Sequence, residues 1–194
     1  MFYSQAGQDQ WVLEMTKNKR SGYFVDLGAY DGVNYSNTFY LEKNLGWNGI
    51  CVEADPLNYK ELTRNRKCVC ENVAVNDYTG FVNFSSSDMG GKIVNNSDVV
   101  ISCDLLENIL IRNQSPEFID YLSIDIEGNE IKVLEKFPFN RWKFGVITIE
   151  HNLYCEGDSN KIKIMDILTN NGYRVERENV SHDGYPFEDW YVLK

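Results

Sequence analysis

Short apolar runs alternate with stretches of helical periodicity along the chain of 194 residues. Strands that are apolar on both faces are typical of a parallel sheet covered by helices on both sides. The apolar runs predict parallel strands at residues 23–27, 49–53, 68–75, 118–126 and 146–150, and a closing antiparallel pair at 173–176 and 190–193. The pattern therefore predicts an α/β three-layer sandwich with a seven-stranded, mostly parallel sheet. Since no linker-like segment divides the chain, residues 1–194 are expected to form one domain.

Apolar residues at helical spacing predict helices between these strands, at residues 8–17, 39–45, 56–64, 105–110, 129–137 and 161–168. Ser36 or Asn37 can cap the second of these helices, and Gly46 is expected at its carboxyl end. Asp55 followed by Pro56 is typical of an N-cap with proline at the first helical position. Ser102 or Asp104 is expected to cap the fourth.

The pattern changes between residues 76 and 96. Residues 81–84 alternate like a strand, and residues 85–96 are rich in Ser, Gly and Asn, which predicts a loop. We therefore expect residues 81–100 to form a loop or small hairpin inserted over the functional site. Such a segment serves as a lid or substrate-binding element, or only decorates the surface.

The chain carries 29 acidic and 19 basic side chains, a formal net charge of -10. Such a surface repels phosphate backbones, so no nucleic-acid partner is expected, and the basic clusters at residues 17–20 and 64–67 are interpreted as solvated. No apolar run reaches membrane-spanning length and no signal-like start is present, so no membrane partner is expected. Five cysteines without a disulfide framework favour reduced thiols and a cytoplasmic location. No interface stripe indicates an oligomeric state.

A nucleoside pocket is predicted where the first two strands end. The first strand runs into Gly28, where any side chain would intrude on a ligand that approaches the backbone. Glu53 follows the second strand and can accept hydrogen bonds from both ribose hydroxyls of an adenosine. Asp26, Gly28 and Glu53 together define this pocket.

The charge of the turn after the first strand favours one nucleoside over another. A dinucleotide site has a second glycine in this turn, which is absent here. Asp26 and Asp31 would repel a diphosphate, whereas they suit the cationic ammonium and sulfonium of S-adenosylmethionine. The turn therefore favours S-adenosylmethionine over NAD.

Several ordered segments carry a family resemblance: SQAGQD at 4–9, FVDLGAYDG at 24–32, SNT at 36–38, WNGICVE at 47–53, NVAV at 72–75, LSIDIEGNE at 122–130 and ITIE at 147–150. In these segments the chain resembles the FkbM family of S-adenosylmethionine-dependent methyltransferases. The resemblance covers roughly residues 4–150. It implies a class I methyltransferase, Rossmann-like fold and O-methylation, often of sugars or natural products.

The resemblance also implies the residues that bind the donor, from its amino-acid end through the ribose to the adenine edge: Asp26, Gly28 and Asp31, then Glu53, then Asn72 and Ala74. Ser36, within one of the shared motifs, is added to this set. Gln5, with Ser4 and Asp9, either closes over the pocket or belongs to a segment that only packs on the sheet.

Acidic residues also follow two later strands, and they are the candidates for the general base that a hydroxyl acceptor needs. We rank the candidates Asp125, Glu150, His151 and Glu127. Converging carboxylates raise the pKa of one of their number, or else hold a divalent cation such as Mg²⁺. Capping of the helix that begins near Asn129 is the structural alternative for Asp125 and Glu127. No histidine pattern typical of metal ligands is present, and no metal-binding residues are assigned.

Aromatic side chains complete the sequence predictions. Phe24, Phe137 and Trp142 are assigned to the core, whereas stacking faces for an acceptor ring are sought among Tyr30, Tyr35, Tyr154 and Trp190. The leading hypothesis is an S-adenosylmethionine-dependent O-methyltransferase that acts on a small-molecule or glycan hydroxyl. The alternatives are a non-catalytic binding or regulatory module with the same fold, and an NAD-dependent oxidoreductase.

Overall fold

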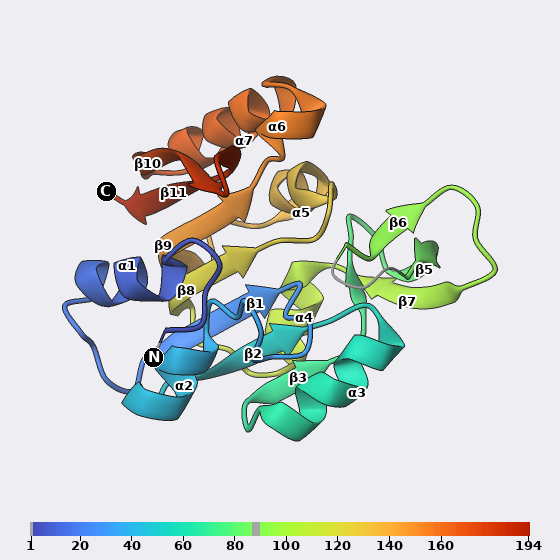
Figure 1. The fold of residues 1–194 in the computed structure, drawn as a ribbon, viewed down its shortest axis with the longest axis horizontal. Coiled ribbons are helices and arrows are strands. Elements are labelled where there is room, and N and C mark those ends of the chain that lie inside the picture. The colour runs from blue at the N-terminus through green and yellow to red at the C-terminus, as the bar shows by residue number, and fades with distance from the viewer. Residues whose placement is uncertain (1, 87–89) are drawn as a thin grey trace.

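The computed structural model of the protein describes residues 2–86 and 90–194, and its main sheet has seven strands in the order β10-β11-β9-β8-β1-β2-β3. The parallel strands are β1 (Tyr23–Leu27), β2 (Asn48–Val52), β3 (Val69–Glu71), β8 (Phe118–Ile124) and β9 (Lys143–Glu150). The antiparallel edge strands are β10 (Tyr173–His182) and β11 (Tyr185–Leu193). The predicted mostly parallel sheet with an antiparallel edge pair is therefore confirmed (Figure 1).

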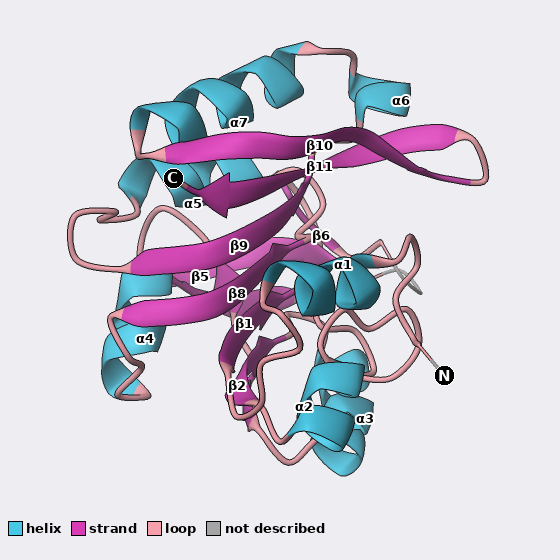
Figure 2. Ribbon diagram, turned by 90° about the vertical axis from the view of Figure 1, so that its left-hand side faces the viewer, coloured by secondary structure: helices cyan, strands magenta, loops and turns pink. Residues whose placement is uncertain are grey.

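Helices cover both faces of this sheet (Figure 2). One face packs against α1 (Gln8–Met15), α2 (Phe39–Leu45) and α3 (Pro56–Asn65), and the other against α4 (Leu106–Arg112), α5 (Glu130–Lys136) and α7 (Ser159–Asn170). A short helix, α6 (Leu153–Glu156), joins β9 to α7. The predicted core residues Phe24, Phe137 and Trp142 are buried in these two layers, as expected.

The helix ends follow from local chemistry. The Asp55 side chain caps α3 by accepting from the N–H of Leu57 at 2.8 Å, as predicted. Gly46 ends α2 with φ of 67°, in the left-handed region that favours glycine. The N-cap of α2 is Thr38 and not Ser36 or Asn37, although the Ser36 hydroxyl accepts from the N–H of Phe39. The N-cap of α4 is Leu105, so the prediction of Ser102 or Asp104 is wrong, because both residues belong to a strand.

The third strand predicted at residues 68–75 is present only in part, because this segment divides between two sheets. β3 pairs with β2, whereas β4 (Ala74–Val75) pairs with β7 (Val100–Asp104) in a second sheet. The second sheet has the order β4-β7-β5-β6, with β5 (Gly80–Ser85) and β6 (Lys92–Val94). The strand expected at residues 81–84 is therefore present, and part of the expected loop at 85–96 is strand. Residues 87–89 of that loop lie outside the described residues.

The last two strands are longer than the sequence predicts. β10 and β11 form a hairpin of ten and nine residues, whose turn at Asp183 and Gly184 extends beyond the main sheet. In Figure 2 the hairpin runs across the upper part of the molecule, between α7 and β9. All five cysteines are free thiols. Across the described part of the chain, no helix has both the length and the apolar character needed to cross a membrane.

Candidate active site

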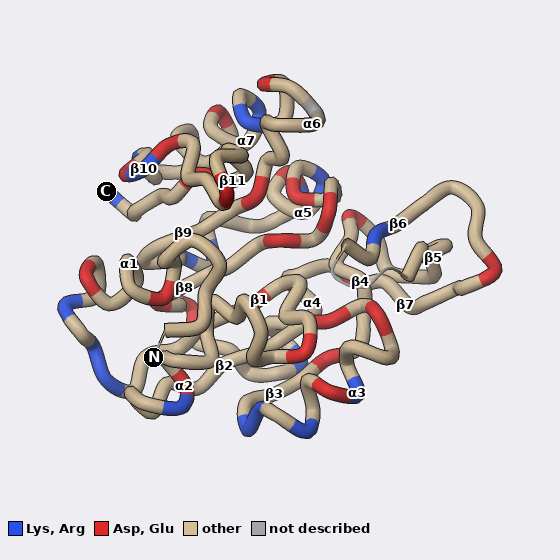
Figure 3. Tube along the Cα trace, viewed as in Figure 1, with Lys and Arg blue, Asp and Glu red and all other residues tan. Residues whose placement is uncertain are grey.

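A cavity of about 460 Å³ lies at the carboxyl ends of β1, β2, β8 and β9. Open α/β sheets bind ligands at this edge. Nine of the residues that the sequence predicts for the site line it: Gln5, Asp26, Gly28, Ser36, Glu53, Ala74, Asp125, Glu127 and Glu150. The segment that follows β8 and the end of β9 carry acidic residues (Figure 3).

The Glu53 carboxylate is held rigidly at the end of β2. It accepts from the backbone N–H groups of Tyr30 at 2.8 Å and Asp55 at 2.7 Å, and the residue is only 8% exposed. Burial raises the pKa of Glu53 to about 7, although the backbone hydrogen bonds oppose this rise. A carboxylate has about four acceptor positions, so Glu53 retains capacity to accept hydrogen bonds from a ligand in the cavity.

Asp26 lies near the end of β1, on the neighbouring strand. Its carboxylate accepts a hydrogen bond of 2.5 Å from the Thr38 hydroxyl, which in turn accepts one of 2.9 Å from Arg66. Burial raises the pKa of Asp26, whereas the positive charge of Arg66 lowers it. The Asp26 carboxylate is therefore fixed in position, and the positive charge of Arg66 partly compensates its negative charge.

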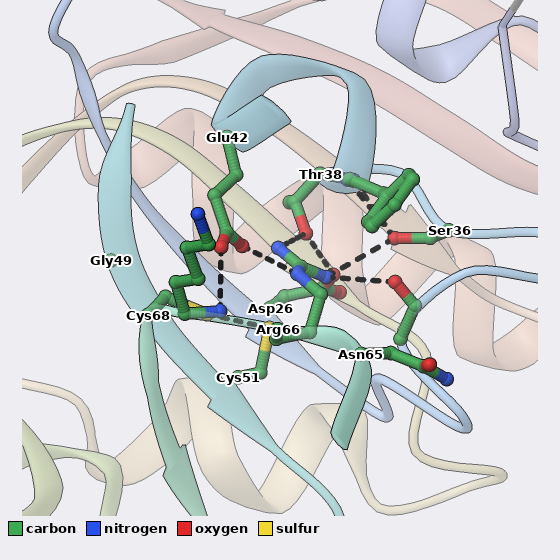
Figure 4. Close-up of polar contacts among 12 residues, drawn as sticks. Asp26, Ser36, Thr38, Glu42, Gly49, Cys51, Asn65, Arg66 and Cys68 are labelled. Atoms are coloured by element: carbon green, nitrogen blue, oxygen red, sulfur yellow. Dashed lines mark hydrogen bonds and ion pairs between the residues drawn. The ribbon is translucent and has the colours of Figure 1, made fainter. Parts of the chain in front are cut away.

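Arg66 contradicts the interpretation of residues 64–67 as a solvated cluster, because its side chain is fully buried. Its guanidinium bonds the Glu42 carboxylate at 2.5 Å and donates to the Ser36 hydroxyl at 3.4 Å (Figure 4). It also donates to the carbonyl of Gly32 at 3.3 Å. One buried cation thus joins the turn after β1 to the start of α2, which supports the position of Asp26 indirectly.

Three carboxylates converge on the other side of the cavity. Oxygens of Asp125, Glu127 and Glu150 lie within 4.8 Å of one another. β8 ends at Ile124, and Glu127 takes a positive φ of 58°, so the predicted strand conformation at 125–126 is wrong. The convergence that the sequence predicts is nevertheless present, because the carboxyl ends of the parallel strands β8 and β9 meet at this edge.

The carboxyl groups of this cluster differ in their tendency to hold a proton. Burial is the largest cause of the raised pKa of both Asp125 and Glu150, and the negative charges of Asp125 and Glu127 raise that of Glu150 well above its ordinary range. The contact between the Asp125 and Glu150 carboxyls lowers the pKa of Asp125 and raises that of Glu150. A proton shared in this pair therefore favours neutral Glu150 and ionised Asp125.

Three predicted site residues do not line the cavity. The Asp31 carboxylate accepts from the N–H groups of Val33 and Asn34 and stabilises the turn after β1. Asn72 lies between β3 and β4, where its amide donates to the carbonyl of Glu53 at 2.8 Å. The side chains of Asp31 and Asn72 thus form hydrogen bonds with backbone groups around the cavity.

His151 is the third, and the structure separates it from the acidic cluster. The residue is 2% exposed, its Nδ1 accepts from the N–H of Leu153 at 3.2 Å, and its Nε2 lies 3.3 Å from Asp189. The His151 side chain is enclosed and does not line the cavity, so the prediction of His151 as a general base is wrong.

The N-terminal segment lies along the cavity. Gln5 and Gln8 line it, whereas the buried Asp9 carboxylate accepts from the Ser4 hydroxyl at 2.6 Å. Ser4 also forms a β-bridge with Tyr35 in the loop after β1. Asp9 therefore has a structural role, in that it holds the segment that carries Gln5 in place.

Three of the four aromatic residues predicted to offer a stacking face line the cavity. Tyr30, Tyr35 and Tyr154 line the cavity. Trp190 does not, because it is 1% exposed and packs on Trp11 with ring centroids 4.8 Å apart. Trp190 is therefore a core residue, and the prediction that its ring offers a stacking face is wrong.

Two segments far from the strand ends complete the cavity wall. Phe84, Gly90, Gly91 and Ile93 belong to residues 81–100, the segment that the sequence predicts over the functional site. The sequence analysis did not predict the other segment, the tip of the β10–β11 hairpin with His182, Asp183, Tyr185 and Phe187. This tip had a signal, since Asp183-Gly184 between alternating residues is typical of a two-residue hairpin turn.

Comparisons with known proteins agree with this geometry. Residues 26–175 match the family model of the methyltransferase FkbM domain. The structure is similar to methyltransferase FkbM from Methylobacillus flagellatus, with a TM-score of 0.61 and 15% identity over 89% of this chain and 44% of that one. The chain therefore spans less than half the length of that relative.

Two further structures share the fold. An O-methyltransferase from Bacillus cereus in complex with SAH matches with a TM-score of 0.59 and 15% identity over 96% of this chain and 80% of that one. A precorrin-6y C5,15-methyltransferase from Geobacter metallireducens matches with a TM-score of 0.56 and 12% identity, over 96% and 87%. These likenesses show the class I methyltransferase fold. No match was found among curated proteins.

Proposed function

The chain belongs to the FkbM methyltransferase family, and from this premise we propose that it transfers the methyl group of S-adenosylmethionine to a hydroxyl oxygen of a saccharide or another small hydroxylated metabolite. The observation that carries the proposal is a single cavity with buried carboxylates at one end and a carboxylate cluster at the other. No lysine or arginine is present among the described residues that line it. This charge suits a cationic donor and opposes a pyrophosphate.

We assign donor binding to the end formed by β1 and β2. Asp26 faces the ammonium of the amino-acid group, Glu53 accepts from the ribose hydroxyls, and Ala74 lies at the adenine edge. Val52, Val73 and Val75 supply apolar lining for the adenine. Gln5 and Ser36 line the same cavity and offer further hydrogen bonds to the donor.

Catalysis is assigned to the carboxylate cluster. S-adenosylmethionine supplies an electrophilic methyl group on its sulfonium sulfur when bound. Asp125 accepts the proton of the acceptor hydroxyl, so that the oxygen lone pair forms the new bond to the methyl carbon while the carbon–sulfur bond breaks. Glu127 accepts a hydrogen bond from a neighbouring hydroxyl and orients the acceptor. Neutral Glu150 removes one negative charge from the cluster, which favours the ionised form of Asp125.

A divalent cation such as Mg²⁺ is the competing role for the same three carboxylates, because their oxygens lie close enough to share one ion. A cation would orient and acidify the acceptor hydroxyl. Turnover in excess EDTA distinguishes the two roles. Retained turnover supports proton transfer to Asp125, whereas loss of turnover that added Mg²⁺ restores supports the cation.

The function is tested by incubating the protein with methyl-labelled S-adenosylmethionine and a pool of glycans and metabolites, followed by mass spectrometry. The expected result is a labelled methyl ether whose formation is lost in Asp125→Asn. Asp166→Asn, an exposed position on α7, is the matched control and should retain transfer. Binding of neither S-adenosylmethionine nor S-adenosylhomocysteine would favour a non-catalytic module, and NADH binding would favour an oxidoreductase.

A further inference from the structure

Three tyrosines at the mouth of the cavity are unusually exposed. Tyr35, Tyr154 and Tyr185 line the cavity and are 50%, 55% and 62% exposed. They come from three separate elements, namely the loop after β1, α6 and the hairpin tip. Exposed aromatic faces that gather around one opening are characteristic of ligand sites.

The base of the hairpin tip is held against the end of β9, which carries Glu150 of the acidic cluster. The carbonyl of Phe187 accepts from the N–H groups of His151 at 2.7 Å and Asn152 at 3.1 Å. Glu188 pairs directly opposite Glu150 in the sheet. The tip therefore has a fixed distance from the proposed catalytic carboxylates.

The aromatic rings at the tip contact rings on both sides of the opening. Tyr185 and Tyr154 have ring centroids 5.8 Å apart, with an interplanar angle of 62°. His182 and Tyr35 have centroids 6.4 Å apart, at 73°. The tip thus spans the opening from α6 to the loop after β1, and it narrows the entrance between two aromatic pairs.

Tyr154 is also electrostatically close to the acidic cluster. Its pKa is raised to about 12, first by desolvation, then by the Cys155 thiol, and further by the negative charges of Glu150 and Glu127. Tyr154, Glu127 and Glu150 line the same cavity, so a ring that stacks on Tyr154 would lie in the cavity that contains these carboxylates.

We infer that Tyr154 and the hairpin tip, through Tyr185 and His182, form the acceptor subsite, and that this subsite takes a neutral hydroxylated ring and rejects an anionic one. The inference rests on the proposed transfer function and adds the specificity-determining residues. Stacking on tyrosine requires only an apolar ring face. Asp125 and Glu127 on one side and Asp183 at the tip accept hydrogen bonds from the ring hydroxyls but repel a carboxylate or phosphate on the ring.

Matched pairs of neutral and carboxylated rings test this subsite directly: methyl glucoside with methyl glucuronide, and catechol with protocatechuate. Saturation-transfer NMR is recorded for each ring with the protein saturated by S-adenosylhomocysteine. The double variant Tyr154→Ala/Tyr185→Ala is compared with Tyr78→Ala, an exposed tyrosine outside the cavity lining. Calorimetric titration with S-adenosylhomocysteine checks that each variant keeps its donor site.

The expected result is binding of at least one neutral ring, with affinity about tenfold lower in the double variant and unchanged in Tyr78→Ala. Its carboxylated counterpart should bind about tenfold more weakly or not at all. Equal binding of both members of a pair, an unaffected double variant, or no ring signal would overturn the inference. If S-adenosylhomocysteine still binds in those cases, the donor site stands; if it does not bind, the proposed function fails as well.

Discussion

A Cβ atom added to Gly28 would lie 1.7 Å from the carbonyl oxygen of Asp125. From the sequence alone, Gly28 is expected to allow close approach of a ligand, but the structure shows that the backbone after β8 needs the space. The N–H of Asp125 donates to the carbonyl of Leu27 at 3.0 Å, so the two segments are in direct contact. The turn of the proposed donor site therefore sets the position of the proposed catalytic base.

Gly28→Ala should consequently be destabilising and should impair turnover more than donor binding. The substitution combines a backbone clash with a φ of 85°, and we expect a loss of about 3 kcal/mol in the free energy of unfolding. Urea denaturation measures it. Gly172→Ala is the control, since Gly172 has a φ of 94° but no atom within 4 Å of the added Cβ. Equal losses of unfolding free energy in the two variants would show that the clash with Asp125 does not contribute.

Asp125→Asn should lower kcat by about 100-fold or more, because general-base catalysis contributes on this scale. The dissociation constant for S-adenosylhomocysteine should change little, since Asp125 is assigned to the acceptor. Turnover and calorimetry of the same preparation separate the two effects. Parallel losses of turnover and donor affinity would instead assign Asp125 to the donor site.

Arg66→Met should cost roughly 3–5 kcal/mol of stability, because it leaves Glu42 without its buried partner and removes hydrogen bonds to Ser36 and Thr38. Arg64→Met is the matched control two residues away, where the ion pair with Glu61 is exposed and should contribute less than about 1 kcal/mol. Urea denaturation of the two variants should therefore differ clearly. A mild effect at Arg66 would mean that water or a rearranged α2 replaces its contacts.

The protein without ligand should become less stable as the pH rises from 5 to 8. Burial raises the pKa of Glu53 and Glu130 from 4.5 to about 7, and that of Glu188 to about 8. The folded state therefore binds protons in this range that the unfolded state has already released, so stability is greatest near the unfolded pKa and is lost as the pH passes the folded values. Urea midpoints at pH 5, 6, 7 and 8 should fall in that order. Midpoints that rise with pH would contradict these shifts.

The sequence predicted the parts of the site that depend on strand ends. Glu53 and Asp125 each follow an apolar strand, and parallel strands bring such ends to one edge. The burial of Arg66 could not be predicted, because its partners Glu42 and Thr38 lie on another helix. Long-range packing, which a local pattern does not encode, decides whether such a charge is solvated or enclosed.

The second sheet and the hairpin tip could be predicted only in part, for the same reason. Glu71 and Asn72 interrupt the apolar residues of segment 68–75 but do not indicate a change of sheet. β4 leaves the main sheet because β7, almost thirty residues later in the chain, pairs with it. The length of β10 and β11 depends on pairing with each other beyond the main sheet, through polar residues such as Glu178 and Ser181 that do not resemble a buried strand.

Calorimetric titration with S-adenosylmethionine tests the central claim most directly. We predict saturable binding at one site, with affinity that increases from pH 6 to pH 8 as Glu53 loses its proton and accepts more strongly from the ribose. Glu53→Gln should bind S-adenosylmethionine at least about tenfold more weakly than the unmodified protein and should lose this pH dependence. Glu135→Gln, at an exposed position on α5, should behave as the unmodified protein. Absence of binding at every pH, or equal binding by Glu53→Gln, would contradict the account.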